Sequence, residues 1–267
     1  MWVFPNGSLD SKSFPGLITD YGILGLASTL RRLRKIDLSG YPFSIFRNGT
    51  GIPSIDVCFE DSVAYARGLC ELDLSNSFVS DELLCLVAEA RLPLHKLVLS
   101  RCFCFTFDGI YFLLSKYQSL TYLDLEGADF LNDESMIELT KFLGNLTFIN
   151  LSLCSKLTNS TFFNLKRNCP LLSIINMGRT NLGVEEFPTE IVVNPRVKSL
   201  YFAWNNSLND ECIKMAANVC PNLEALDVTY FSGITEEGIL AILKSCLQIR
   251  CLQISRCEGV KNLEIDF

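Results

Sequence analysis

The sequence is poor in histidine and in the residue spacings that bind metals or phosphates. It has a single histidine, His95, and none of its 12 cysteines forms a Cys-x-x-Cys pair, so the usual zinc-ligand sets are absent. No phosphate-binding glycine loop opens a helical segment. His95 has no matched serine or cysteine partner that the sequence identifies, and a surface or packing role is expected for it. We therefore predict no catalytic residues, no metal and no cofactor, and expect that the chain is not an enzyme.

Positive charge and long apolar runs are scarce as well. The chain has 23 Lys+Arg against 30 Asp+Glu, a net charge of −7, which argues against a nucleic-acid partner because phosphate contacts need a concentrated positive field. No apolar run reaches the length of about 18 residues that spans a membrane, and the first residues lack the features of a secretory signal. We predict no membrane contact, a cytoplasmic or nuclear location, and reduced cysteines.

A repeated pattern of the form Leu-x-x-Leu-x-Leu dominates the rest of the chain. Its first anchors recur at intervals of 25, 26, 26, 26, 25, 26 and 26 residues. These first anchors are Leu69, Leu94, Leu120, Leu146, Leu172, Val197, Leu223 and Ile249. An earlier copy at Leu33 stands 36 residues before Leu69, and the turn-forming residues near 46–54 predict a loop insertion there. Self-similarity at this period predicts a solenoid of stacked repeats.

Each copy divides into a strand and a helix. The anchors at the fourth and sixth positions point one way and the residues between them the other way, as in a strand. Ser80, Asn132, Asn209 and Thr235 then precede acidic residues, as helix N-caps do. Apolar residues follow at helical spacing in Leu83, Leu84 and Val87, in Ile137, Leu139 and Phe142, and in Ile239, Ile242 and Leu243. Pro188 and Pro195 interrupt the helix expected between Thr180 and Val197.

These features predict an α/β fold, a leucine-rich-repeat solenoid. The expected architecture is a horseshoe with parallel β-strands on the concave face and helices on the convex face. Residues 1–32 are interpreted as a degenerate N-terminal repeat region, and residues 33–267 as one continuous solenoid with the loop insertion near 46–54.

Six of the cysteines fall at two fixed positions of the repeat. Cys102, Cys154 and Cys257 stand at the ninth position, where another copy has Asn205. A small polar side chain that turns inward there can bond the backbone of adjacent repeats. Three more end the predicted helices, twice in front of proline. These three are Cys169, Cys220 and Cys246.

The repeats resemble the cysteine-containing leucine-rich repeats of F-box/leucine-rich-repeat proteins, especially the large plant set, within the ribonuclease-inhibitor-like superfamily. Two segments carry the resemblance, LTFINLSLCSKLTNSTFFNLKRNCP at 146–170 and VKSLYFAWNNSLNDECIKMAANVCP at 197–221. In that family the repeats capture a substrate protein, while an F-box binds the Skp adaptor of a cullin-based ubiquitin ligase. The compact three-helix pattern of an F-box is not evident in the first sixty residues. The resemblance thus implies adaptor and cullin docking only through an F-box outside this chain.

Outward strand positions carry large apolar side chains that predict a partner-binding surface on the concave face, because exposed apolar patches usually mark interaction sites. The predicted surface consists of Tyr122, Phe148, Leu153, Ile174, Tyr201, Trp204 and Tyr230. Arg101, Arg179 and Arg256 are expected at its rim; tyrosine, tryptophan and arginine are frequent interface anchors. The alternative is that several of these aromatic residues pack on one another.

Acidic residues recur at the fifth strand position in Asp37, Asp73, Asp124 and Asp227. We interpret them as a solvated acidic row that would favour a basic stretch on the partner.

Three functions compete on this sequence. The first is the substrate-recognition part of an SCF-type E3 ubiquitin ligase, or a repeat-only scaffold related to one, acting in ubiquitin-dependent protein degradation. The second is a hormone-type receptor that holds a small ligand on the concave face, which would need clustered inward Lys and Arg. The third, an extracellular receptor domain, is disfavoured by the absent signal segment.

Overall fold

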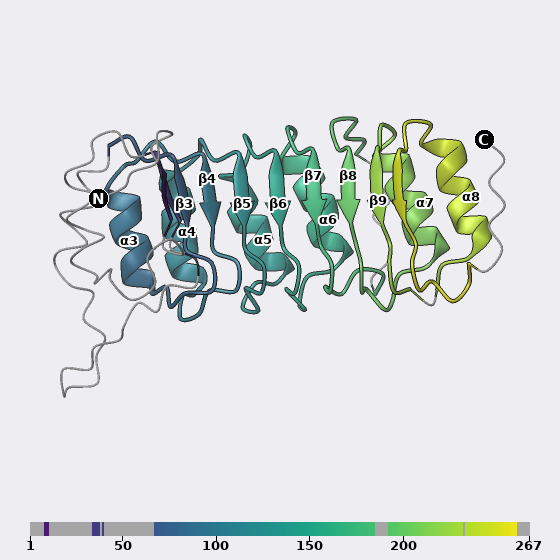
Figure 1. Cartoon of the computed structure of the whole chain (residues 1–267), viewed down its shortest axis with the longest axis horizontal. Coiled ribbons are helices and arrows are strands. Elements are labelled where there is room, and N and C mark those ends of the chain that lie inside the picture. Colours follow the sequence, from purple (N-terminus) through teal and green to yellow (C-terminus); the bar gives the residue numbers. More distant parts are fainter. Residues whose placement is uncertain are drawn as a thin grey trace. The chain divides into compact units, whose positions relative to one another are not determined.

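The computed structural model describes residues 8–10, 34–37, 39, 67–184, 192–231 and 233–260. The chain forms two compact units, residues 1–124 and 125–267, called here the N-terminal unit and the C-terminal unit. Within each unit, strands lie side by side in one layer and helices form a second layer behind them (Figure 1). The predicted α/β fold of strand-plus-helix repeats is therefore confirmed within each unit.

The N-terminal unit contains five described strands, all parallel and paired in chain order. They are β1 (Ser8–Asp10), β2 (Lys35–Asp37), β3 (Glu71–Asp73), β4 (Lys96–Val98) and β5 (Tyr122–Asp124). Behind the strands lie α3 (Asp81–Glu89) and α4 (Phe107–Lys116). Strand β1 lies within the segment 1–32 that the sequence analysis sets apart, and it pairs with β2 in parallel register. The predicted insertion near 46–54 lies outside the described residues.

The C-terminal unit repeats this pattern. Its described strands are β6 (Phe148–Asn150), β7 (Ile174–Asn176), β8 (Ser199–Tyr201), β9 (Ala225–Asp227) and β10 (Cys251–Gln253). Its described helices are α5 (Asp133–Thr140), α6 (Asn159–Asn168), α7 (Asp210–Val219) and α8 (Glu236–Ser245). No helix is described between β7 and β8, where Pro195 lies in a turn; Pro188 lies outside the described residues.

The core lies between the two layers and is built from the repeat anchors. The fourth-position anchors Leu97, Leu123, Ile149 and Leu200 are 0% exposed, because each points from its strand toward the helices. In the last described repeat, Leu252 is only half-buried. Stacking of neighbouring repeats therefore buries the fourth-position anchors of the interior repeats almost completely, with at most 6% exposed at Ile36.

Helix starts follow the predicted caps with two differences. The side chains of Ser80, Asn132 and Asn209 accept hydrogen bonds from backbone N–H groups in the first turns of α3, α5 and α7. Thr235 makes no such bond. The expected apolar face of α5 is partly wrong: Leu139 is buried as expected, but Ile137 is 46% exposed, because the helix turns Met136 inward in its place.

A carboxylate at the start of one helix holds the start of the next. Asp81 accepts hydrogen bonds from the backbone N–H and the hydroxyl of Thr106, both at 2.7 Å. Asp210 binds Thr235 in the same way at 2.9 and 2.6 Å. A Cβ at Gly238 would lie 2.1 Å from Asp210 Oδ1, so glycine at this position makes room for the carboxylate. We call each such contact an Asp–Thr brace.

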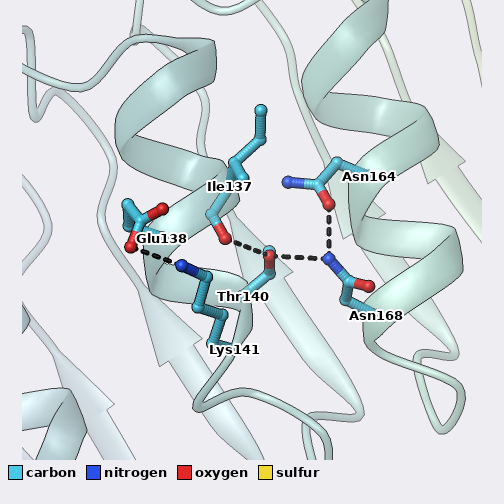
Figure 2. A network of polar contacts seen from close by, with 6 residues as sticks. All are labelled: Ile137, Glu138, Thr140, Lys141, Asn164 and Asn168. Carbon is cyan, nitrogen blue, oxygen red and sulfur yellow. Dashed lines mark hydrogen bonds and ion pairs between the residues drawn. The ribbon is translucent and has the colours of Figure 1, made fainter.

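Polar contacts also join the helices of the C-terminal unit (Figure 2). The amide of Asn168 on α6 donates to Thr140 Oγ1 on α5 at 3.1 Å and to Asn164 Oδ1 at 2.5 Å. Thr140 donates in turn to the carbonyl of Ile137 at 3.0 Å. This network satisfies buried polar atoms between the helices and fixes the layer that supports the strands.

Candidate protein-binding surface

The strands present their third and fifth positions away from the helices, on what we call the strand face. Alternation along the strand would turn the eighth position inward, yet that residue adopts a left-handed conformation, with φ between 53° and 77° in all eight described copies. The eighth-position residues are Asn76, Arg101, Gly127, Leu153, Arg179, Trp204, Tyr230 and Arg256. The turn points their side chains outward and sends the ninth residue into the core.

The left-handed turn also continues the backbone ladder. The N–H of Trp204 donates to the carbonyl of Thr229 at 3.0 Å, and the N–H of Tyr230 donates to that of Ser255 at 2.9 Å. For residues other than glycine and asparagine this conformation costs about 1 kcal/mol or more. Asn76 and Gly127 at the same position are the sequence signal that could have revealed the turn.

The ninth position confirms the expected role of the cysteines and of Asn205. The thiols of Cys102, Cys154 and Cys257 donate to the carbonyls of Leu74, Leu125 and Val228 in the preceding repeats, at 2.9, 3.4 and 3.1 Å. Burial raises the pKa of Cys102 to about 12, so this thiol stays protonated. All cysteines that the structure describes are free thiols.

Asn205 makes the largest set of bonds at this position. Its amide donates to the carbonyls of Met177 and Phe202, both at 2.7 Å, and its oxygen accepts from Thr180 and Leu182. It is 0% exposed. Asn205 thereby ties together the two repeats on either side of the segment that lacks a described helix.

The fifth-position acids do not form the solvated row that the sequence suggested. Asp37, Asp73 and Asp227 accept hydrogen bonds from the backbone N–H two residues later, at 3.0, 3.0 and 2.9 Å. Asp124 is only 8% exposed. These side chains shape the turn after the strand, so the acidic row is half-buried or buried and hydrogen-bonded rather than freely solvated. Its preference for a basic partner stays a prediction.

None of the ten predicted partner-binding residues is buried. Trp204, Arg101, Arg179 and Arg256 are exposed, and the other six are half-buried. Tyr122 and Arg101 lie in the N-terminal unit, and the remaining eight lie in the C-terminal unit.

In the N-terminal unit, most strands carry a charged residue at the third position. Lys35, Glu71 and Lys96 are successive register neighbours. The ammonium of Lys96 lies 4.4 Å from the centre of the Tyr122 ring. Burial, followed by the charges of Asp124 and Asp73, raises the pKa of Tyr122. The single aromatic residue predicted here is thus already covered by a cation of its own unit.

In the C-terminal unit the same position is uncharged. Phe148 and Ile174 are register neighbours on β6 and β7, followed by Ser199, Ala225 and Cys251. Tyr201, at the fifth position of β8, lies between Asn176 and Asp227. This unit therefore brings Phe148, Ile174 and Tyr201 onto one strand face, with a single carboxylate among its third- and fifth-position residues.

Four eighth-position residues of the C-terminal unit form a continuous stack. The ring centres of Trp204 and Tyr230 are 3.5 Å apart at an interplanar angle of 16°. The guanidinium carbon of Arg179 lies 4.7 Å from the centre of the Trp204 ring, and that of Arg256 lies 5.2 Å from the centre of the Tyr230 ring. We call these four residues the arginine-capped stack. Their spacing of one repeat is visible in the sequence, but their stacking is not.

A buried cation in the helix layer escaped the sequence analysis. Lys166 on α6 is 2% exposed, and its ammonium has no hydrogen-bond partner. It lies 5.4 and 5.3 Å from the ring centres of Phe162 and Phe163. Burial lowers its pKa from 10.5 to about 8. The ring faces compensate only part of the desolvation cost.

Neither a metal cluster nor a membrane helix is found in the described parts of the chain. No group of three or more His, Cys, Asp or Glu residues there could hold a metal ion. None of the helices described is long and apolar enough to cross a membrane.

Solved structures with the same architecture identify the fold. A chain of the yeast Rad7–Elc1 complex aligns over 84% of this chain and 63% of its own length, with a TM-score of 0.58 and 18% identity. Internalin C2 of Listeria monocytogenes aligns over 73% and 75%, with a TM-score of 0.54 and 19% identity. LegL7 of Legionella pneumophila, a leucine-rich-repeat protein, aligns over 92% and 81%, with a TM-score of 0.53 and 16% identity. The chain is an α/β leucine-rich-repeat solenoid.

Sequence comparison gives a distant relative. No protein-family profile matches the chain. The F-box protein MAX2 homolog A of Petunia hybrida is 25% identical over 118 residues, which cover 39% of this chain. The match spans only 17% of the petunia protein. Part of the chain is thus similar to part of an F-box protein, the kind of relative that its cysteines suggested.

Proposed function

We propose that this solenoid is the substrate-recognition module of an SCF-type E3 ubiquitin ligase and acts in ubiquitin-dependent protein degradation by binding, without chemistry of its own. The observation that carries the proposal is the uncharged strand face of the C-terminal unit. Phe148, Ile174 and Tyr201 lie there half-exposed, on repeats that resemble those of an F-box protein. Docking to a Skp adaptor and a cullin would be supplied by an F-box outside this chain.

The dimensions of the strand face support a protein rather than a metabolite as the partner. Five strands spaced about 4.8 Å apart give a face about 20 Å across. A protein partner buries about 800 Å² on each side of a stable interface. The half-buried aromatic and aliphatic residues would act as anchors, because apolar side chains that lose water on binding contribute most of the affinity.

The proposal is tested in cells that express the tagged full-length protein and are treated with a proteasome inhibitor. The variant Phe148→Glu/Ile174→Lys places two charges on the strand face. Proteins bound to parent and variant are quantified by mass spectrometry. We expect the Skp adaptor and the cullin with both proteins, and at least one ubiquitinated protein with the parent only.

A matched control distinguishes damage to the strand face from damage to the fold. Ile137→Lys/Leu240→Glu introduces the same pair of charges in the same unit, at apolar residues of α5 and α8 that are 46% and 40% exposed. This variant should retain the ubiquitinated protein. Absence of the Skp adaptor from the parent sample, or equal loss of the ubiquitinated protein in both variants, would contradict the proposal.

A further inference from the structure

We propose that the arginine-capped stack binds an extended acidic segment of the partner protein, with one carboxylate on Arg179 and another on Arg256. The inference deepens the proposed function and rests on it in one respect only, which is that the partner is a protein. It starts from the exposure of both arginines and from the stacked rings that hold them in place.

Both guanidinium groups are available to an anion. Neither arginine forms an ion pair within the part of the chain that the structure describes. A guanidinium that covers a ring with its flat face keeps the N–H groups in its plane free to donate. A carboxylate can then accept two parallel hydrogen bonds from each arginine, which is the strongest pairing that either group makes.

The stack fixes the distance between the two charges. Arg179 and Arg256 belong to the repeats of β7 and β10, which are three repeats apart. At about 4.8 Å between neighbouring strands, this separates them by about 14 Å. An extended peptide advances about 3.3 Å per residue, so four residues cover about 13 Å. Carboxylates at positions i and i+4 of an extended segment therefore match the two arginines.

The residues between and beside the arginines suit the middle of such a segment. The edges of Trp204 and Tyr230 lie between the two charges and present an indole N–H and a phenol. The preceding seventh-position residues are small: they are Gly178, Ala203, Thr229 and Ser255. A peptide backbone can approach the stack without a large side chain in its way.

The charge pattern favours carboxylates over nucleic acid. Phosphate chains bind to clustered cations, whereas this stack offers two single charges about 14 Å apart on a chain of net charge −7. One acid lies near Arg256 in the sequence: Glu258, two residues later, is exposed. Its negative charge weakens the attraction of Arg256 for an anion, so Arg179 is expected to contribute more.

Fluorescence of Trp204 provides a direct test on the full chain. The sequence has two tryptophans, so a Trp2→Phe background leaves Trp204 as the only reporter. The probes are capped nine-residue peptides of glycine, serine and alanine that carry two glutamates four residues apart, two glutamates adjacent to each other, or two glutamines. We expect the first peptide to change the emission of Trp204 at low salt and to bind at least fivefold more tightly than the other two.

Variants assign the binding to the arginines. Arg179→Gln should weaken binding of the first peptide at least fivefold, and Arg256→Gln should weaken this binding by a smaller factor. The control Lys141→Gln/Lys214→Gln removes two positive charges from the helices of the same unit and should stay within twofold of the parent. The variant Trp204→Asn/Tyr230→Asn, followed by peptide NMR, should also lose binding. Asparagine is compatible with the left-handed backbone, as Asn76 shows.

Equal binding of all three peptides, binding of none, or retention of affinity in Arg179→Gln would overturn the inference. These outcomes leave the proposed function untouched, since the Phe148→Glu/Ile174→Lys experiment does not depend on the stack. Conversely, spacing-dependent peptide binding without any ubiquitin-ligase partner would sustain the stack as an acidic-segment site and refute the ligase role.

Discussion

The two units use one repeat backbone but carry different side chains on their strand faces. In the N-terminal unit the third position reads Lys35, Glu71, Lys96 and Tyr122, and in the C-terminal unit it begins with Phe148 and Ile174 and stays uncharged. The inward anchors of interior repeats in both units are buried apolar residues. Inward positions therefore hold the repeat together, and outward positions are free to differ between the units.

The ninth position shows a second contrast. The thiol of Cys102 in the N-terminal unit donates one hydrogen bond of 2.9 Å to a carbonyl of the preceding repeat. The amide of Asn205 in the C-terminal unit donates to two carbonyls and accepts from two backbone N–H groups. The amide therefore ties two neighbouring repeats together with more hydrogen bonds than the thiol does.

Replacing Asn205 should produce the largest difference between the units. Asn205→Ala leaves two buried carbonyls and two N–H groups without their partner and should lower the free energy of unfolding by about 3 kcal/mol. Cys102→Ala removes one weak bond and should cost about 1 kcal/mol. Urea unfolding followed by circular dichroism measures both values. Equal losses would contradict the special role of the amide.

The second-largest difference between the units is expected when the Asp–Thr braces are removed. In the C-terminal unit Asp133 accepts from the N–H and hydroxyl groups of both Thr158 and Thr161, so Asp133→Ala should destabilise the protein by about 2 kcal/mol. Among the described residues of the N-terminal unit, Asp81 binds only Thr106, and Asp81→Ala should cost about 1 kcal/mol. Thermal unfolding of the two variants should preserve this order; a larger effect of Asp81→Ala would show that bond number does not govern the brace.

Replacing Lys166 in the C-terminal unit should stabilise the protein, whereas the replacements above destabilise it. Lys166→Met removes a buried ammonium and should raise the free energy of unfolding by about 2 kcal/mol at neutral pH. The folded pKa is about 8 and the ordinary value is 10.5. Between pH 8 and pH 10.5 the unfolded chain binds more protons than the folded chain. The destabilisation that buried Lys166 causes is therefore complete below about pH 8 and declines as the pH rises toward 10.5.

The pH dependence is read from the difference between variant and parent. Burial raises the pKa of Cys169 and Cys220 from 9.0 to about 12, so both proteins lose stability above pH 9 as unfolded thiols ionise. The advantage of Lys166→Met should shrink from pH 8 to 10.5 in urea titrations. A constant advantage would mean that the lysine is already neutral or already solvated.

The smallest effect is expected at the eighth position. Trp204→Asn loses the stack on Tyr230, which is worth about 1 kcal/mol, but relieves about the same left-handed strain. The net change in the free energy of unfolding should stay within about 0.5 kcal/mol. Arg101→Asn, at the same position in the N-terminal unit, relieves the same left-handed strain and should change the free energy of unfolding by a few tenths of a kcal/mol. Differential scanning calorimetry measures both changes.

The repeat and its inward positions could be predicted from the sequence because they depend on spacing alone. The anchors, the cap residues Ser80, Asn132 and Asn209, and the bonding of Cys102 and Asn205 all follow from a side chain's place within one copy. The rest depends on the sign of φ or on neighbours one repeat away. Asp73 looked like a surface acid, and only the turn geometry shows that it binds the Ser75 N–H.

In the candidate site, too, the sequence predicts some features and not others. Trp204, Tyr230 and the arginines were expected to point outward from the repeat position that they share, although strict strand alternation would turn that position inward. That they stack depends on rotamers and on the left-handed turn, which no spacing encodes. Lys166 was missed because a lysine on an amphipathic helix normally reaches solvent, whereas here it lies over two phenylalanine rings.

Site-specific photo-crosslinking tests the central claim, that the strand face of the C-terminal unit holds the partner, most directly. A benzophenone amino acid replaces Ile174 on the strand face, or Ile137 on the helix face of the same unit, in the full-length protein in proteasome-inhibited cells. We predict a ubiquitinated adduct from position 174 and none from position 137. An adduct from position 137 together with none from position 174 would contradict the account.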